Sequence, residues 1–213
     1  MRVGEAPCLP PPAFSWPEMK KLLDIIRCGL AAALLFSFAA PATAQTVQER
    51  LATCLACHGE NGQSTVPLTP SLGAQPAFFL SIQIFMFRDK IRAVPLMNQM
   101  TQGISNNDLK ALSAAISKLP PPQPPAGTPD AARMDAARTL AEQNRCNICH
   151  GSNYAGGENV PRIASQREDY LAKTLREYKA NARRGYDAAM SDVLHSVNDE
   201  QIGDLAYFLS RLK

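Results

Sequence analysis

The sequence CLACH at residues 54–58 returns as CNICH at residues 146–150, so each stretch holds two cysteines followed at once by a histidine. On an α-helix, residues at positions i, i+3 and i+4 share one face, so each stretch presents two thiols and an imidazole together. The chain has six cysteines, and four of them belong to these two stretches. The two stretches are therefore the first candidates for cofactor sites.

The pattern C-x-x-C-H is the attachment motif for c-type haem, in which two thiols bond one macrocycle and the histidine faces its iron. We therefore predict two covalently attached c-type haems. The predicted attachment and iron-ligand residues are Cys54, Cys57 and His58 for the first haem, and Cys146, Cys149 and His150 for the second. A disulfide, a thioredoxin-like redox pair and half of a zinc site are the alternatives, but each of them tolerates other residues after the second cysteine.

Residues 1–44 have the organisation of a signal peptide region. Met19 opens a basic start, residues 30–40 are a short apolar run, and residues 42–44 form a small-residue cleavage site. The apolar run is shorter than the roughly 20 residues that a membrane-spanning helix needs. We expect translation from Met19, cleavage after Ala44 and export to the periplasm. Retention of this segment as a membrane anchor is the alternative.

The composition is that of a folded domain rather than a disordered chain. Hydrophobic residues make up 46% of 213 residues. The net charge of +3 comes from 22 basic and 19 acidic residues, so the chain lacks the basic excess of a nucleic-acid-binding protein.

The chain repeats itself after each haem motif. The sequence PSLGAQ at residues 70–75 corresponds to PRIASQ at residues 161–166, and a middle helix is predicted after each. A methionine and a capped closing helix then follow in both halves. The predicted middle helices are residues 76–90 and 168–183, and the predicted closing helices are residues 106–119 and 199–212, with Ser105 and Asn198 as N-caps. This order predicts an internal duplication of about 80 residues.

A proline-rich stretch at residues 120–129 separates the two repeats and favours extended polyproline geometry. We therefore predict a first domain at residues 45–119, a linker at residues 120–129 and a second domain at residues 130–213. Each domain is small for a core built from side chains alone. A covalent haem would supply much of its apolar filling.

Each half resembles a class I cytochrome c, and the tandem resembles the two-haem cytochromes of the cytochrome c4 type. The resemblance implies an all-α fold of two tandem helical domains, each built around a haem. It also implies that the loops at Pro70 and Pro161 accept a hydrogen bond from the ligand imidazole. One departure concerns the closing helix, where Tyr207 and Phe208 supply the family's aromatic residue in the second half. The matching residues of the first half are Ala114 and Ala115.

The sixth iron ligand is predicted to be a methionine in each half. Met97 and Met190 hold equivalent places before the closing helices. Met100 is the rival in the first half, and His195 is the rival in the second. Met86 and Met134 are predicted to pack in helices. Four arginines are candidates for the haem propionates or, equally, for a solvated helix face: Arg88, Arg92, Arg183 and Arg184.

An iron closed by histidine and methionine has no open position for a substrate. We therefore expect a monomeric electron carrier without catalytic residues. Its expected donor is a dehydrogenase or a quinol-oxidising complex, and its expected acceptor is a terminal oxidase or another redox protein, some of them membrane-bound. A dedicated subunit of a periplasmic dehydrogenase, a dihaem enzyme with one exchangeable ligand, and a gas sensor are the competing hypotheses.

Overall fold

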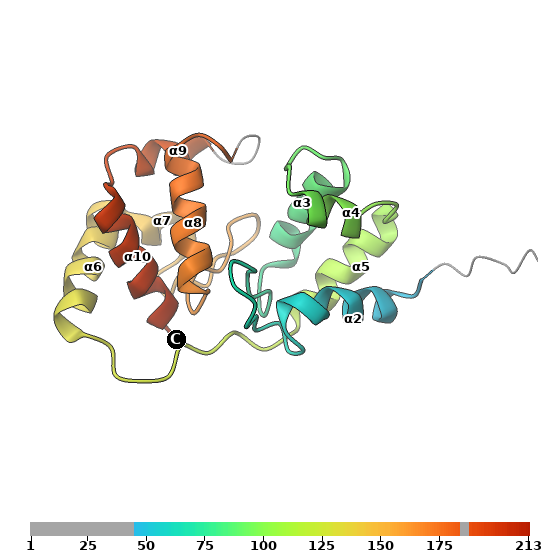
Figure 1. The fold of residues 1–213 in the computed structure, drawn as a ribbon, viewed down its shortest axis with the longest axis horizontal. Helices are drawn as coiled ribbons and strands as arrows, with labels where there is room; N and C mark the ends of the chain where they lie inside the picture. Colours follow the sequence, from blue (N-terminus) through green and yellow to red (C-terminus); the bar gives the residue numbers. More distant parts are fainter. Residues whose placement is uncertain (1–44, 184–187) are drawn as a thin grey trace, which may run out of the picture. The chain divides into compact units, whose positions relative to one another are not determined.

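The computed structural model describes residues 45–183 and 188–213 (Figure 1). The signal peptide region at residues 1–44 and the candidate Arg184 lie outside the described residues. Residues Gln45–Lys213 form one compact unit. Its described part contains helices and a single isolated β-bridge between Gly157 and Val160, but no strand. The prediction of an all-α fold is confirmed.

The helices follow the order expected of a duplicated chain. Those of the first half are α2 (Val47–His58), α3 (Ala77–Arg88), α4 (Pro95–Met100) and α5 (Asn106–Ser117). Those of the second half are α6 (Ala131–Gln143), α7 (Cys146–His150), α8 (Glu168–Lys179), α9 (Ala188–Leu194) and α10 (Asp199–Arg211). The domain boundaries given above remain a prediction.

The two middle helices end earlier than the sequence predicts. Lys90 and Asn181 both have positive φ angles, of 58° and 51°. A residue in the left-handed region ends a helix, so α3 stops at Arg88 and α8 stops at Lys179. The closing helices start where predicted, because the side chains of Ser105 and Asn198 accept hydrogen bonds from backbone N–H groups of the first turn.

The second half has an extensive apolar core between α6, α8 and α10 (Figure 1). Phe208 of α10 is 1% exposed, and its ring meets the ring of Tyr154 edge to face at 5.9 Å. Met134 packs against the same core, as predicted. The resemblance placed an aromatic residue of the closing helix at this crossing, and Phe208 is buried there.

The core of the first half is built differently, from α3 and α2 packed on α5. Its buried side chains include Leu112 of α5 and, as predicted, Met86 of α3. On α5, Ala114 is exposed and Ala115 is only half-buried. The closing helix of the first half therefore lacks the buried aromatic ring that Phe208 gives the closing helix of the second half.

The proline-rich stretch runs from α5 to α6 without helix and is attached to the first half. The Gln63 side chain forms two hydrogen bonds with the backbone of Gln123, one to its carbonyl and one from its N–H, both 3.1 Å long. Among residues 45–183 and 188–213, no helix combines the length and the hydropathy needed to cross a bilayer.

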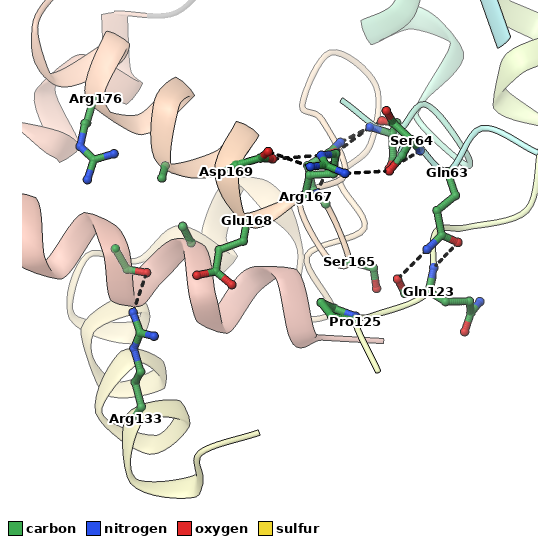
Figure 2. A pocket seen from close by; sticks show the side chains of 15 residues that line it. Gln63, Ser64, Gln123, Pro125, Arg133, Ser165, Arg167, Glu168, Asp169 and Arg176 are labelled. Atoms are coloured by element: carbon green, nitrogen blue, oxygen red, sulfur yellow. Dashed lines mark hydrogen bonds and ion pairs between the residues drawn. The ribbon is translucent and has the colours of Figure 1, made fainter. Parts of the chain in front are cut away.

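A groove of about 620 Å³ is lined by residues of both halves (Figure 2). Arg167 of the second half donates a hydrogen bond to the carbonyl of Ser64 at 3.1 Å. Its guanidinium also pairs with Asp169 at 2.7 Å, and that carboxylate accepts a hydrogen bond from the backbone N–H of Leu68. Charged and backbone groups thus connect the two halves along this groove.

Candidate cofactor sites

The first C-x-x-C-H stretch forms the last turn of α2. His58 is the final residue of this helix, and Gly59 follows it with a φ of 89°, which glycine adopts at little cost. Cys54 is half-buried, Cys57 is exposed, and both thiols are free. The helical geometry therefore presents the two thiols and the imidazole on one face.

The His58 ring is held by the loop that follows the motif. Its Nδ1 lies 2.7 Å from the carbonyl oxygen of Pro70. A carbonyl oxygen can only accept, so Nδ1 carries the proton and the lone pair is on Nε2. Burial lowers the pKa of His58, and the hydrogen bond to Pro70 opposes that shift only in part. The ring is therefore a neutral imidazole with Nε2 ready to bind a metal.

The second stretch lies in its own short helix, α7. Arg145, with a φ of 54°, breaks the chain between α6 and α7, whereas α2 runs unbroken into its motif. His150 is buried, and its Nδ1 lies 2.9 Å from the carbonyl oxygen of Pro161. The structure thus brings together the predicted histidine and proline of each half in the same way.

The environment of Cys54 and Cys146 disfavours a redox-active pair of thiols. Burial raises the pKa of the Cys54 and Cys146 thiols, whereas a redox-active pair has a lowered thiol pKa. The four cysteines of the described residues are free, so they form no disulfide. Within residues 45–183 and 188–213, no three His, Cys, Asp or Glu side chains gather to hold a metal ion by themselves.

The candidate sixth ligands lie on short helices rather than in loops. Pro95 opens α4 at its first turn, where a proline is well tolerated. On α4, Met97 is half-buried and Met100 is 40% exposed. Met190 of α9 packs against the second-half core, as Cys146 does. His195 is exposed.

Asn98, which the sequence analysis did not single out, holds the segment that carries Met97. Its Nδ2 donates hydrogen bonds to the carbonyls of Phe87 at 2.7 Å and Arg92 at 2.8 Å. Its Oδ1 accepts a hydrogen bond from the N–H of Val94 at 2.9 Å. One side chain therefore ties the start of α4 to the end of α3.

The candidate arginines differ in their surroundings. Arg88 binds the carbonyl of Ile104 and the side chain of Asn106, so it supports the start of α5. The other two described arginines, Arg92 and Arg183, meet at Tyr170. Burial of the Tyr170 hydroxyl raises its pKa, but the guanidinium groups of Arg183 and Arg92 outweigh that effect and lower it to about 7.

The cluster of Arg92, Arg183 and Tyr170 has more hydrogen-bond donors than acceptors. Arg92 donates to Oε1 of Gln83 at 2.6 Å, and Nε2 of the same buried amide has no partner among the described residues. The side chain of Arg183 is 7% exposed, and the only carboxylate paired with it among those residues is Glu177, at 3.4 Å. The cluster is therefore short of anionic oxygen, which haem carboxylates would supply. With the two histidines, this makes the residues present a good fit to c-type haem.

Two glutamines form a second set of residues that the sequence analysis left without a role. Gln75 and Gln166 hold the same position in the repeat, and each reaches from its own half to the backbone of the other. The one sequence signal that could have indicated their role is that a glutamine ends both PSLGAQ and PRIASQ. The contact itself depends on how the two halves meet, which a single repeat does not show.

Comparisons with known proteins agree with this architecture. The family model described as Cytochrome c matches residues 134–213. The thiosulfate dehydrogenase electron acceptor of Thiomonas intermedia (strain K12) is 30% identical over 202 residues, which cover 90% of this chain and 91% of that protein. Cytochrome c4 of Thiocapsa roseopersicina is 27% identical over 173 residues, which cover 75% of this chain and 86% of the relative.

A solved structure shows the same fold. The reduced recombinant cytochrome c4 from Pseudomonas stutzeri superposes with a TM-score of 0.70 at 24% identity, covering 80% of this chain and 100% of that chain. The family model reaches only the second half, but the relatives and this structure extend the similarity through the first.

Proposed function

Because the chain belongs to the dihaem c-type cytochromes of the cytochrome c4 type, we propose that it is a periplasmic carrier of single electrons. Its cofactors are two covalently bound c-type haems. A haem iron with two axial protein ligands exchanges one electron and leaves no position for a substrate. The remaining question is which residues of this chain hold each haem and keep its iron closed.

For the first haem, the proposed thioether residues are Cys54 and Cys57, and the axial ligands are His58 and Met97. For the second, they are Cys146 and Cys149, with His150 and Met190. The observation that carries this assignment is the matched pair of hydrogen bonds from His58 to Pro70 and from His150 to Pro161. Each bond fixes the ring through its Nδ1, which is the usual outer-shell support of a metal-binding histidine.

The burial of the candidates supports the choice of distal ligands. Met97 is half-buried, whereas Met100 is 40% exposed. The side chain of Met97 therefore needs less movement to reach a buried iron. Met190 lies on the second-half core, whereas His195 is exposed. For the propionates, the proposed partners are Arg92 and Arg183, because the cluster around Tyr170 is short of anionic oxygen.

Spectroscopy and ligand binding test the assignment directly. Acid–acetone extraction should leave two haems on each chain, and the oxidised protein should show the weak band of iron bound to a thioether. Met97→Ala should open the first iron to carbon monoxide, and Met190→Ala should open the second. Met100→Ala and His195→Ala should leave both closed. Carbon monoxide binding to the unsubstituted reduced protein would instead favour the dihaem enzyme or the gas sensor.

A sulfur-compound dehydrogenase is the donor that the comparisons favour. The relative from Thiomonas intermedia is named as the electron acceptor of a thiosulfate dehydrogenase. We therefore place this chain after a periplasmic dehydrogenase, as a free carrier or as its dedicated electron-transfer subunit, and before a terminal oxidase. Rapid reduction by a purified thiosulfate dehydrogenase would support this order, and co-purification with the dehydrogenase would favour the subunit.

A further inference from the structure

Two buried glutamines make a reciprocal connection between the halves. Gln166 accepts a hydrogen bond from the N–H of Ser71 and donates one to its carbonyl, both 2.8 Å long. Gln75 does the same for Arg162, at 3.0 and 2.8 Å. Each glutamine is 5% exposed, and Ser71 is 2% exposed. Hydrogen bonds at such buried positions are strong, because little water competes for them.

The glutamines bind Ser71 and Arg162, and each of these residues directly follows a proline whose carbonyl accepts a hydrogen bond from a histidine. The carbonyl of Pro70 and the N–H of Ser71 belong to one planar peptide unit. The oxygen of that unit accepts from His58 Nδ1 at 2.7 Å, and its N–H donates to Gln166 at 2.8 Å. In the other half, the peptide between Pro161 and Arg162 joins His150 to Gln75 in the same order.

We propose that Gln166 and Gln75 are positioning residues that set the electron-donating strength of the histidine in the opposite half. A hydrogen bond to a peptide N–H polarises its carbonyl and makes the oxygen a better acceptor. The better acceptor draws the Nδ1 proton of the histidine, which raises the basicity of Nε2 and favours the oxidised iron. Each half thereby lowers the reduction potential of the haem in the other.

This inference rests on the proposed binding of iron by His58 and His150, and it makes a crossed prediction. A glutamine that merely joined the halves would, when removed, disturb both haems alike or neither. A glutamine acting through the peptide unit shifts only the haem of the opposite half. The direction of the crossing therefore separates the two roles.

The chain offers a matched control in Gln63. Its amide also binds the N–H and the carbonyl of one backbone residue, Gln123, but that residue is in the linker (Figure 2). Gln63→Met removes the same pair of hydrogen bonds without touching a peptide that binds a histidine. Gln166→Met and Gln75→Met remove the pairs that do.

The experiment uses the full-length protein with both haems. The potential of each haem is followed by NMR through its own methyl signals during a redox titration, and the histidine Nδ1–H signals are recorded in the reduced state. Gln166→Met should favour the reduced form of the first haem by about threefold, or about 30 mV at 59 mV per tenfold. It should also move the Nδ1–H signal of His58 upfield and leave the second haem unchanged.

Gln75→Met should do the same to the second haem and to His150, and Gln63→Met should change neither haem. Equal shifts of both haems, or unchanged His58 and His150 signals in both variants, would overturn the proposal. Gln166→Glu is a second variant that keeps an acceptor for Ser71 N–H, so the first potential should not rise. Carbon monoxide binding by the unsubstituted protein would instead overturn the proposed iron ligands, which keeps the two failures distinct.

Discussion

Replacing Asn98 with alanine should loosen the distal side of the first haem without removing any proposed ligand. The Asn98 side chain makes three hydrogen bonds to the backbone, one to the last turn of α3 and two to the segment between α3 and α4. Met97 is the preceding residue, so the position of its sulfur depends on this segment. Alanine keeps the helix but removes all three bonds, which leaves the longer backbone hydrogen bonds from Lys90 N–H to the carbonyl of Phe87 at 3.1 Å and from Val94 N–H to the carbonyl of Arg92 at 3.2 Å.

The size of the effect follows from the bonds that are lost. Three part-buried hydrogen bonds contribute about 0.8 kcal/mol each, and the better helix propensity of alanine returns about 0.5 kcal/mol. Opening of the segment that carries Met97 should therefore become easier by about 2 kcal/mol. At about 1.4 kcal/mol per tenfold, the open population rises about thirtyfold.

Stopped-flow mixing of the reduced protein with carbon monoxide measures that population, because the gas binds only when the thioether has left the iron. The rate of binding at the first haem should rise about thirtyfold, in proportion to the open fraction. Gln99→Ala is the matched control: it changes the next residue of α4, whose side chain is exposed. The reasoning is refuted if Asn98→Ala lowers thermal stability but leaves the binding rate equal to that of Gln99→Ala.

Further substitutions test the core, the cation cluster and the register of the ligands. Phe208→Ala should destabilise the second half by about 3 to 5 kcal/mol in denaturant unfolding, since the Phe208 ring is 1% exposed. The control Tyr207→Phe loses only one hydrogen bond, from the N–H of Asp130, and should destabilise the protein by about 1 kcal/mol. Arg183→Gln should lower a haem potential in a redox titration, because a nearby cation favours the less positive reduced iron; an unchanged potential would place the haem carboxylates elsewhere. His195→Ala should leave the absorption spectra of both haems unchanged, since its side chain is exposed; loss of the thioether band would make His195 part of the site.

The residues proposed to bind a haem are close together in the sequence, which is why they could be predicted without a structure. Cys54, Cys57 and His58 share one helical turn, and that geometry is fixed by the backbone alone. The N-caps Ser105 and Asn198 could be predicted for the same reason, since their hydrogen bonds reach only the next turn. Local patterns therefore predicted the starts of the closing helices and the candidate ligands.

The residues that support the ligands could not be found in this way. Asn98 binds one carbonyl at the end of α3 and one in the loop before α4, and its role depends on a chain reversal that propensities do not specify. Tyr170 meets Arg92 only because the two halves are in contact. The short helices α4 and α9, which carry Met97 and Met190, were not predicted either; α4 begins with Pro95, and proline is favourable at a first helical turn.

The reciprocal glutamine contact has a simple origin in the duplication. When two similar units meet about a twofold axis, every contact between them occurs twice. The second contact joins the residues that are equivalent to those of the first. Gln75 and Gln166 are such equivalents, and so are Ser71 and Arg162. Each half contains its own cysteines, histidine and methionine, but the backbone beside its histidine is completed by the other half. On the proposed assignment, a single half would keep its haem ligands and lose the glutamine that adjusts one of them, which gives the duplicated chain a reason to retain both halves.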